Sequence, residues 1–230
     1  MTSWSTVKAV LSAVSVCCLI LAAACSRGSI RSAESYDEGR RLEKAEKYED
    51  AIRAYREALR FRPDEPHAYY HLGNCYFHLR QFDAAVPVYR KAMSLAPDYA
   101  WPCIGLGRCY LDRDNEQAIA LFKEAIRRAP DLAIAHYDLG EALSMQALLD
   151  WVQAGMGGRR DAESESPNMR EAIAAYKEAI RLQPDLWFAY EDLAHCYRRL
   201  GREEDAAAAD REAARLRPVK GGAKLGAGPP

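Results

Sequence analysis

The strongest constraint on the fold is a proline that recurs at a nearly constant spacing. Successive spacings of 34, 33, 54 and 34 residues separate Pro63, Pro97, Pro130, Pro184 and Pro218. A period of this length is typical of arrays in which each repeat is one supersecondary unit that packs on its neighbours. The sequence therefore predicts a stack of similar units in place of one globular core.

Alignment on these prolines gives three repeat positions that hold only Gly or Ala. These three columns are Gly39, Gly73, Gly107, Gly140 and Ala194; Ala51, Ala85, Ala118, Ala172 and Ala206; and Ala58, Ala92, Ala125, Ala179 and Ala213. Two antiparallel helices approach closely only where neither carries a bulky side chain. We therefore expect paired helices that cross at these positions. Large rings follow the second column by four residues and are expected to fill the wider gaps: Tyr55, Tyr89, Phe122 and Tyr176.

This pattern resembles the tetratricopeptide repeat, whose order is large apolar, Leu-Gly, Tyr, Ala, aromatic and Pro. The second repeat matches it best, with Tyr69, Leu72, Gly73, Tyr76, Phe82, Ala85, Tyr89, Ala92 and Pro97. The resemblance implies an all-α superhelix of five helix-turn-helix repeats, which acts as a protein-binding scaffold and not as an enzyme. The repeats are expected over residues 32–65, 66–99, 100–132, 133–186 and 187–218.

Both ends of the predicted array carry polar residues at positions that are apolar in the inner repeats. Ser35 and Glu38 do so in the first helix, and Glu203 and Asp210 do so in the last. Because the terminal faces of a solenoid meet water, these residues predict caps and no sixth repeat. Residues 219–230 are expected to form a flexible tail.

The fourth repeat carries about 20 extra residues, which we place at 144–166. Residues 144–153 are apolar enough to prolong the first helix, Gly155–Gly158 should end it, and Ser166-Pro167 should start the next helix. The protruding loop is either a tolerated surface insertion or a partner contact. The contact would be centred on Leu148, Leu149 and Trp151.

Residues 1–24 have the composition of a signal peptide. Lys8 precedes an uncharged stretch, residues 9–24, which is shorter than the roughly 20 residues that span a bilayer. The sequence Ala22-Ala23-Ala24-Cys25 resembles a bacterial lipobox, which implies cleavage after Ala24, acylation of Cys25 and a lipidated tether over 25–31. Ordinary secretory cleavage and an uncleaved anchor are the alternatives.

Several acyl chains on Cys25 would hold the protein on a membrane permanently, whereas one chain anchors only marginally. Ser26 after the cysteine resembles the outer-membrane sorting signal of enteric bacteria. We therefore expect a protein anchored to the outer membrane that faces the periplasm.

In the tetratricopeptide family the first helix of each repeat lines a concave groove that holds a protein or peptide. Exposed aromatic residues beside Arg dominate protein interfaces, and these are the strongest candidates here: Tyr70, Phe77, Trp101 and Arg108. The alternative is that some of these rings pack on the neighbouring repeat. The full predicted lining is Tyr36, Arg40, His67, Tyr70, Asn74, Phe77, Trp101, Ile104, Arg108, Leu111, Ile134, Tyr137, Glu141, Phe188, Glu191, His195 and Arg198.

Other chemistry has little support in the sequence. Lys+Arg at 32 and Asp+Glu at 33 give a formal charge of −1, so no nucleic-acid partner is expected. A stripe of His67, His71, Cys75 and His78 makes metal binding a distant alternative, because one straight helix can offer only two of these residues to one ion. We expect no metal, no cofactor and no small-molecule substrate.

The cysteines of the predicted repeats fit packing better than reactivity. Cys75, Cys109 and Cys196 share one repeat position, where a small residue is usual, and Cys103 lies on another face of its helix. Equivalent positions in adjacent repeats are too far apart for a disulfide. All four are therefore expected to be unbridged, small, buried hydrophobic residues.

The layout as a whole resembles the tetratricopeptide pilot lipoproteins of type IV pilus secretins and the lipoprotein adaptors of peptidoglycan hydrolases. An assembly factor for outer-membrane proteins is the alternative of a different class. In each case the groove would bind a protein or peptide, and a lipid anchor would attach the protein to the membrane.

Overall fold

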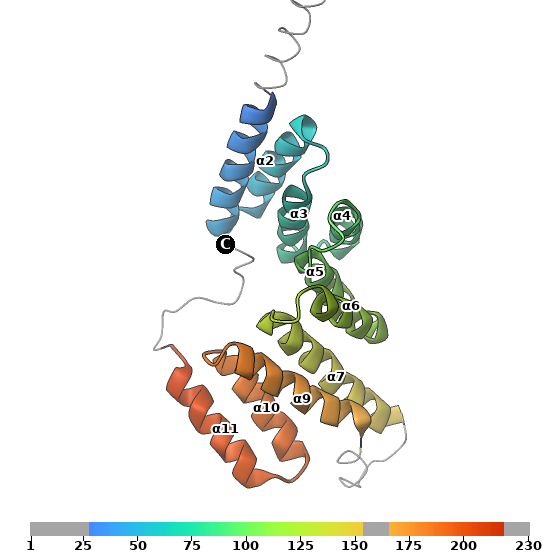
Figure 1. The fold of residues 1–230 in the computed structure, drawn as a ribbon, viewed down its shortest axis with the longest axis vertical. Coiled ribbons are helices and arrows are strands. Elements are labelled where there is room, and N and C mark those ends of the chain that lie inside the picture. The colour runs from blue at the N-terminus through green and yellow to red at the C-terminus, as the bar shows by residue number, and fades with distance from the viewer. Residues whose placement is uncertain (1–27, 154–165, 219–230) are drawn as a thin grey trace, which may run out of the picture. The chain divides into compact units, whose positions relative to one another are not determined.

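The computed structural model describes residues 28–153 and 166–218, and its regular elements there are all α-helices (Figure 1), as predicted. In chain order they are an unlabelled helix over residues 28–44, α2 (Tyr48–Phe61), α3 (Pro66–His78), α4 (Phe82–Leu95), α5 (Trp101–Tyr110), α6 (Asn115–Arg128), α7 (Ala133–Gln153), α9 (Pro167–Leu182), α10 (Trp187–Arg199) and α11 (Glu203–Leu216).

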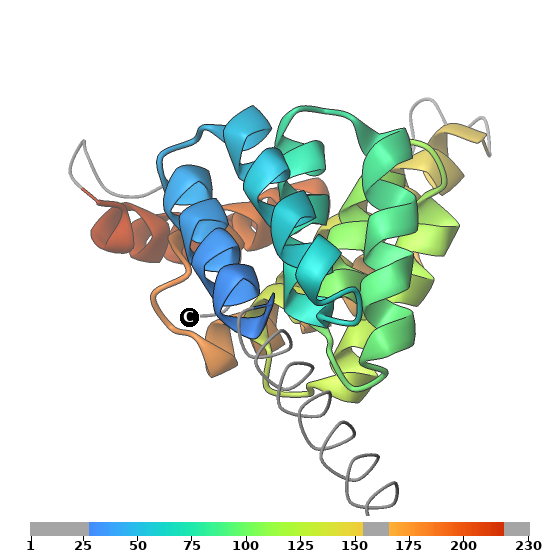
Figure 2. The same ribbon diagram turned by 90° about the horizontal axis from the view of Figure 1, so that it is seen from above.

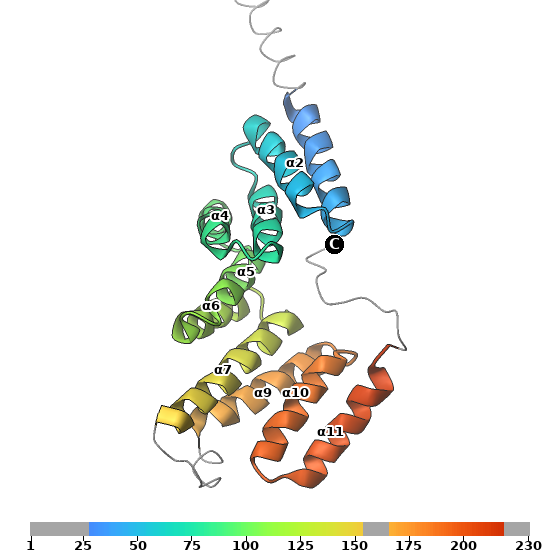
Figure 3. The ribbon, with the colours of Figure 1, turned by 180° about the vertical axis from the view of Figure 1, so that it is seen from behind.

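The chain divides into two compact units, Met1–Leu95 and Ala96–Pro230. In the first, helix 28–44 pairs with α2 and α3 pairs with α4 (Figure 2). In the second, α5 pairs with α6, α7 with α9 and α10 with α11 (Figure 3). The helical hairpins match the five predicted repeats. The division into units is not predicted, because the repeat pattern runs through residue 95 without interruption.

The recurring prolines end the second helix of each hairpin. Pro63, Pro97, Pro130, Pro184 and Pro218 each follow the last helical residue by two positions. The residue before a proline disfavours helical backbone, so the helix must stop there. Other prolines begin helices: Pro66 and Pro167 occupy the first turns of α3 and α9, where no backbone N–H is needed.

Each glycine of the first small-residue column lies directly beneath an aromatic ring. A Cβ added to Gly39 or Gly73 would lie 2.6 Å from the ring of Tyr55 or Tyr89. The same atom would lie 2.6 Å from Phe122 at Gly107 and 2.8 Å from Tyr176 at Gly140. These separations are too short for real carbon atoms, and the rings are fully buried. Our expectation that the rings fill wider gaps away from the small residues is therefore wrong: each ring packs directly on the glycine, which makes room for it.

The fifth hairpin is a natural control for this relation. It has no ring, since Asp210 stands at the aromatic position, and there the glycine column holds Ala194. Ala194 is buried, and Asp210 accepts two hydrogen bonds of 2.8 Å from Arg198 Nη2. Glycine thus occurs in this column only where a ring covers it.

The two alanine columns are also buried throughout the described hairpins. This burial agrees with the expectation that these small residues lie where helices pack together. Because close-packed interiors tolerate little extra volume, these positions leave no room for larger side chains.

In three hairpins, the turn after the first helix has a left-handed backbone conformation at the same repeat position. Glu46, Arg80 and Gly201 occupy equivalent positions after the first helix, with φ of 57°, 57° and 70°. In the first of these turns the N–H of Glu46 donates to Glu43 O at 2.9 Å, and the next N–H, of Lys47, donates to Leu42 O at 2.9 Å. This pair of bonds is the Schellman helix end, which favours glycine at the left-handed position.

The predicted extension of the fourth repeat is confirmed up to Gln153, the last residue of α7. Asn115 Nδ2 of α6 donates to Ala142 O at 2.8 Å, and Asn168 Nδ2 of α9 donates to Asp150 Oδ2 at 2.8 Å. The extended helix is thereby tied to the helices on both sides. Gly155–Gly158 and the loop predicted after them lie outside the described residues.

We predict that Gly107→Leu lowers the free energy of unfolding by about 1–3 kcal/mol, because the new side chain overpacks the contact with Phe122. Urea unfolding followed by circular dichroism measures the change. An unchanged unfolding midpoint would contradict the register. As a control, the smaller change Gly107→Ala should cost far less in a Phe122→Ala background than in the wild type.

We predict that Glu46→Gly raises the free energy of unfolding by about 0.5–1 kcal/mol, because it removes left-handed strain at an exposed residue. Gly201→Ala is the matched change in the opposite direction and should destabilise the chain by a similar amount. Thermal unfolding of both variants tests the pair, and a lower midpoint for Glu46→Gly would rule out the strain.

Candidate functional site

The predicted lining residues lie on the first helices of the hairpins and are divided between the two units. Within the first unit, helix 28–44 and α3 carry Tyr36, Arg40, His67, Tyr70, Asn74 and Phe77. Within the second unit, Trp101, Ile104 and Arg108 lie on α5, Leu111 directly follows it, Ile134, Tyr137 and Glu141 lie on α7, and Phe188, Glu191, His195 and Arg198 lie on α10.

Three of these residues are not exposed as expected. Tyr70, Ile104 and Phe188 are only 5%, 2% and 8% exposed. The ring of Tyr70 lies 5.2 Å from the ring of His71, and the ring of Phe188 meets that of Tyr137 edge-on at 4.6 Å. These apolar side chains therefore belong to the hydrophobic core, and Tyr70 is no longer a leading binding candidate.

The other lining residues keep part of their surface accessible. His67 and His195 are exposed. The remainder are half-buried: Tyr36, Arg40, Asn74, Phe77, Trp101, Arg108, Leu111, Ile134, Tyr137, Glu141, Glu191 and Arg198. Phe77, Trp101 and Arg108 thus remain available as interface candidates.

In the first unit, a carboxylate joins three helices. Glu43 Oε2, on helix 28–44, accepts a hydrogen bond from Tyr55 Oη of α2 at 2.6 Å and lies 2.9 Å from His71 Nδ1 of α3. The rings of Tyr55 and His71 stack with centroids 5.6 Å apart. Burial alone would raise the pKa of Glu43, but the hydrogen bond and charge of His71 and the hydrogen bond from Tyr55 outweigh burial and lower this pKa. A buried carboxylate is stable here because it is paired.

The residues of the predicted histidine and cysteine stripe on α3 also make contacts within the protein. His71 faces Glu43, the ring of His78 stacks on Tyr48 at 4.7 Å, and His67 Nδ1 lies 3.1 Å from Glu65. Cys75 is fully buried. In residues 28–153 and 166–218, no group of three or more His, Cys, Asp or Glu side chains could hold a metal ion.

The four cysteines of the described hairpins form no disulfide and are buried, as the sequence predicts. Burial raises the pKa of the Cys103 thiol to about 11 and that of the Cys109 thiol to about 12. A thiolate is the reactive form of cysteine, so these side chains serve as packing groups.

In the second unit, two polar contacts join the first helices of successive hairpins. Arg108 of α5 donates from Nε to Asp138 Oδ2 at 2.8 Å and from Nη2 to Asp138 Oδ1 at 3.1 Å. Tyr137 Oη of α7 donates to Asp192 Oδ2 of α10 at 2.8 Å. Asp138 is only 1% exposed, and the two-point contact of its carboxylate holds the Arg108 guanidinium in one orientation.

Glu141 lies on α7 one helical turn beyond these residues. Burial is the main cause that raises the pKa of its carboxyl to about 7, and the charges of Asp138 and Asp192 add to the effect. Asp138 and Asp192 each have a partner, whereas no hydrogen bond or ion pair of the Glu141 carboxylate appears among the described residues. A positively charged group from a bound partner would therefore be favoured beside Glu141.

Sequence reasoning missed Glu43, Asp138 and Asp192. Glu43 occupies the same repeat position as Phe77, which belongs to the predicted lining. His71, Asp138 and Asp192 occupy one common repeat position, and each contacts the first helix of the preceding hairpin. A polar residue recurring at a position that faces the neighbouring helix was the signal that could have found them.

The end of α7 leaves apolar side chains in water. Leu148, Leu149 and Val152 are exposed, whereas Trp151 is half-buried. Two of the three residues proposed as a partner contact in the insertion are thus accessible.

The predicted membrane attachment concerns Cys25 and residues 1–24, which lie outside the described part of the chain. Among the helices of residues 28–153 and 166–218, none combines the length and apolar character needed to cross a bilayer.

Two family models match separate parts of the chain. A tetratricopeptide repeat model matches residues 36–100, and a model of the regulator of microtubule dynamics proteins 1–3 matches residues 117–222. No curated protein matches this chain.

Solved structures of MamA are similar in fold. One crystal structure of MamA superimposes with a TM-score of 0.60 at 21% sequence identity, covering 81% of this chain and 91% of that chain. A structure of MamA from Desulfovibrio magneticus RS-1, from residue 41 to the end, gives a TM-score of 0.61 at 20% identity, with 81% and 94% covered. At this identity the likeness concerns the fold.

The small residues at the helix contacts, the proline-ended hairpins and these matches agree. Residues 36–100 match the tetratricopeptide repeat, and the helical hairpins of the described residues have the tetratricopeptide α-α fold.

Proposed function

We propose that this protein is a membrane-anchored scaffold of the bacterial cell envelope that binds a protein or peptide through the first helices of its hairpins. The tetratricopeptide fold itself supports a role in protein–protein interaction. The observation that carries the proposal is the polar face of α5, α7 and α10. There Arg108 is held by Asp138, and Glu141 lies half-buried with no ion pair among the described residues; the nearby Arg108 charge lowers the pKa of Glu141 by less than burial and the neighbouring carboxylates raise it.

Such a face suits binding because its charged groups are fixed before a partner arrives. The Arg108–Asp138 contact removes most of the freedom of the guanidinium, so little conformational entropy is lost on binding. The four cysteines of the described hairpins are buried packing groups, and His71 makes an inter-helix contact with Glu43. This use of the reactive residue types favours binding over catalysis.

The envelope assignment rests on the lipobox-like sequence that ends at Cys25. In this proposal the acyl chains hold the hairpins at the periplasmic side of the outer membrane. The arrangement is that of a pilot lipoprotein of a pilus secretin. An adaptor for peptidoglycan hydrolases and an outer-membrane assembly factor are the alternatives, and the identity of the captured partner separates them.

We predict that Glu141→Gln reduces partner capture from envelope extracts about tenfold, because a charge-assisted contact contributes roughly 1.5–3 kcal/mol. The substitution keeps the shape of the side chain, and quantitative mass spectrometry of the captured proteins measures the loss. Glu116→Gln, at an exposed residue of the second helix α6, is the matched control and should capture as the wild type does. Equal capture by both variants would show that the polar face binds nothing.

We predict that Cys25→Ser moves the protein from the membrane fraction to the soluble fraction after cell breakage, because no acyl chain can be attached. Membrane flotation and metabolic labelling with palmitate measure the change. Cys17→Ser leaves the lipobox-like sequence intact and should stay membrane-bound and labelled. Labelling that survives Cys25→Ser would exclude this anchor.

A further inference from the structure

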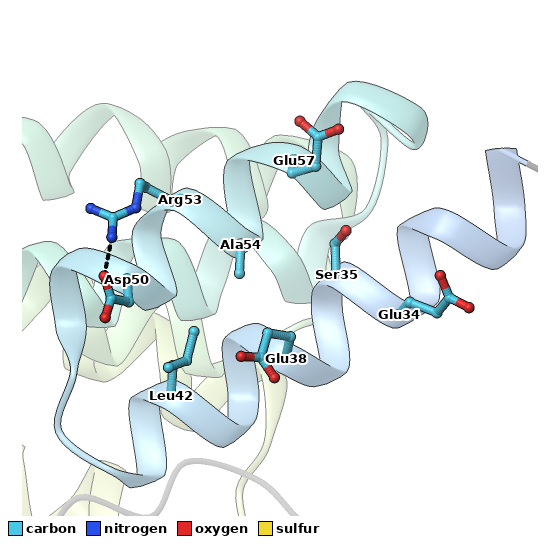
Figure 4. A pocket seen from close by; sticks show the side chains of 8 residues that line it. All are labelled: Glu34, Ser35, Glu38, Leu42, Asp50, Arg53, Ala54 and Glu57. Carbon is cyan, nitrogen blue, oxygen red and sulfur yellow. Dashed lines mark hydrogen bonds and ion pairs between the residues drawn. The ribbon is translucent and has the colours of Figure 1, made fainter.

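The first hairpin carries an open groove on its outer face, between helix 28–44 and α2 (Figure 4). Small or apolar side chains, Ser35, Leu42 and Ala54, lie among charged ones. Four carboxylates and one guanidinium complete the lining, so the groove is acidic: Glu34, Glu38, Asp50, Glu57 and Arg53.

The same groove recurs inside the second unit, between α7 and α9. By repeat position, Ser35, Glu38, Asp50, Ala54 and Glu57 correspond to His136, Leu139, Glu171, Ala175 and Glu178, which line the inner groove. The inner groove has one further wall, because Lys123 and Ile126 of α6 complete its lining. Lys123 Nζ lies 2.7 Å from Glu171 Oε1. In the fourth hairpin, the second helix of the preceding hairpin, α6, thus packs along this groove.

The last hairpin has a helix, α11, that resembles α6 in the residues that would face such a groove. In α11, Arg211 and Ala214 occupy the repeat positions of Lys123 and Ile126. Both are exposed, as are Ala207 and Ala208 on the same side. An alanine-rich face permits close approach to another helix, and Arg211 brings positive charge to it.

From this internal correspondence we propose that α11 of one copy of the chain docks in the first-hairpin groove of a second copy, as α6 docks on α7 and α9. Arg211 then joins the exposed Arg53–Asp50 ion pair at Asp50, in the place that Lys123 takes beside Glu171. The acidic lining and the basic residue of α11 are complementary in charge. The inference goes beyond the proposed function, because it uses the outer faces of the terminal hairpins and leaves the polar face of α5, α7 and α10 open.

The contact joins two different surfaces, so each added copy presents a new groove or a new α11 and further copies can follow. Glu38 stands where the inner groove has Leu139, so the first-hairpin groove is more polar than the inner one. Association is therefore weaker than the packing of hairpins within one chain, and it depends on salt.

Sedimentation velocity of the full chain in mild detergent, over a range of protein concentrations, tests the proposal. The wild type should show a mass that rises with concentration. Arg211→Glu and Asp50→Arg should each weaken association about tenfold, since each places like charges in contact, and Ala54→Arg should block the groove. Lys91→Glu, an equal charge change at an exposed residue of α4, should associate as the wild type does. Circular dichroism confirms that the variants fold.

The charge exchange gives the decisive comparison. An equimolar mixture of the Asp50→Arg and Arg211→Glu proteins should regain association, because every junction between unlike copies again pairs opposite charges. A full chain that stays monomeric at all concentrations would overturn the proposal. Association that is insensitive to Arg211→Glu, Asp50→Arg and Ala54→Arg would overturn it as well.

Discussion

The contact between an aromatic ring and a glycine backbone is the constraint on which the rest of the structure depends. In four hairpins a fully buried ring of the second helix lies so close to the first helix that no Cβ can stand between them. Large rings contribute much of the apolar burial that stabilises a small unit, and here each ring also sets the distance between its two helices. In these four hairpins, one pair of residues thus fixes how the two helices pack together.

Within each of the two units, polar side chains link the first helices of neighbouring hairpins. The Glu43–His71, Arg108–Asp138 and Tyr137–Asp192 contacts each join a hairpin to the next one in the same unit. A buried charge without a partner is costly, so these pairs specify one alignment of the hairpins. The same pairs orient the residues of the proposed binding face, which ties the chemistry of the site to the packing of the fold.

Much of the fold was predictable because period, helix ends and small-residue columns are properties of single positions. Proline spacing located the hairpins, and the apolar composition of residues 144–153 predicted the long α7. The site was less predictable, because it depends on pairs. Repeat position alone could not tell that Tyr70 packs among rings while Phe77 keeps accessible surface, nor that Asp138 would meet Arg108. The place of the rings was misjudged for the same reason, since the glycine and aromatic columns had been interpreted separately.

The fifth hairpin allows the ring-to-glycine contact to be built where it is absent. Asp210→Tyr and Ala194→Gly, made singly and together, form a double-mutant cycle in which the loss of the Arg198 contact occurs in both Asp210 variants and cancels. Urea unfolding should show that Asp210→Tyr destabilises the chain when Ala194 is present and is tolerated in the Ala194→Gly background. The expected coupling is about 1–3 kcal/mol, within the range found for residues in contact. Additive effects of the two changes would contradict the account.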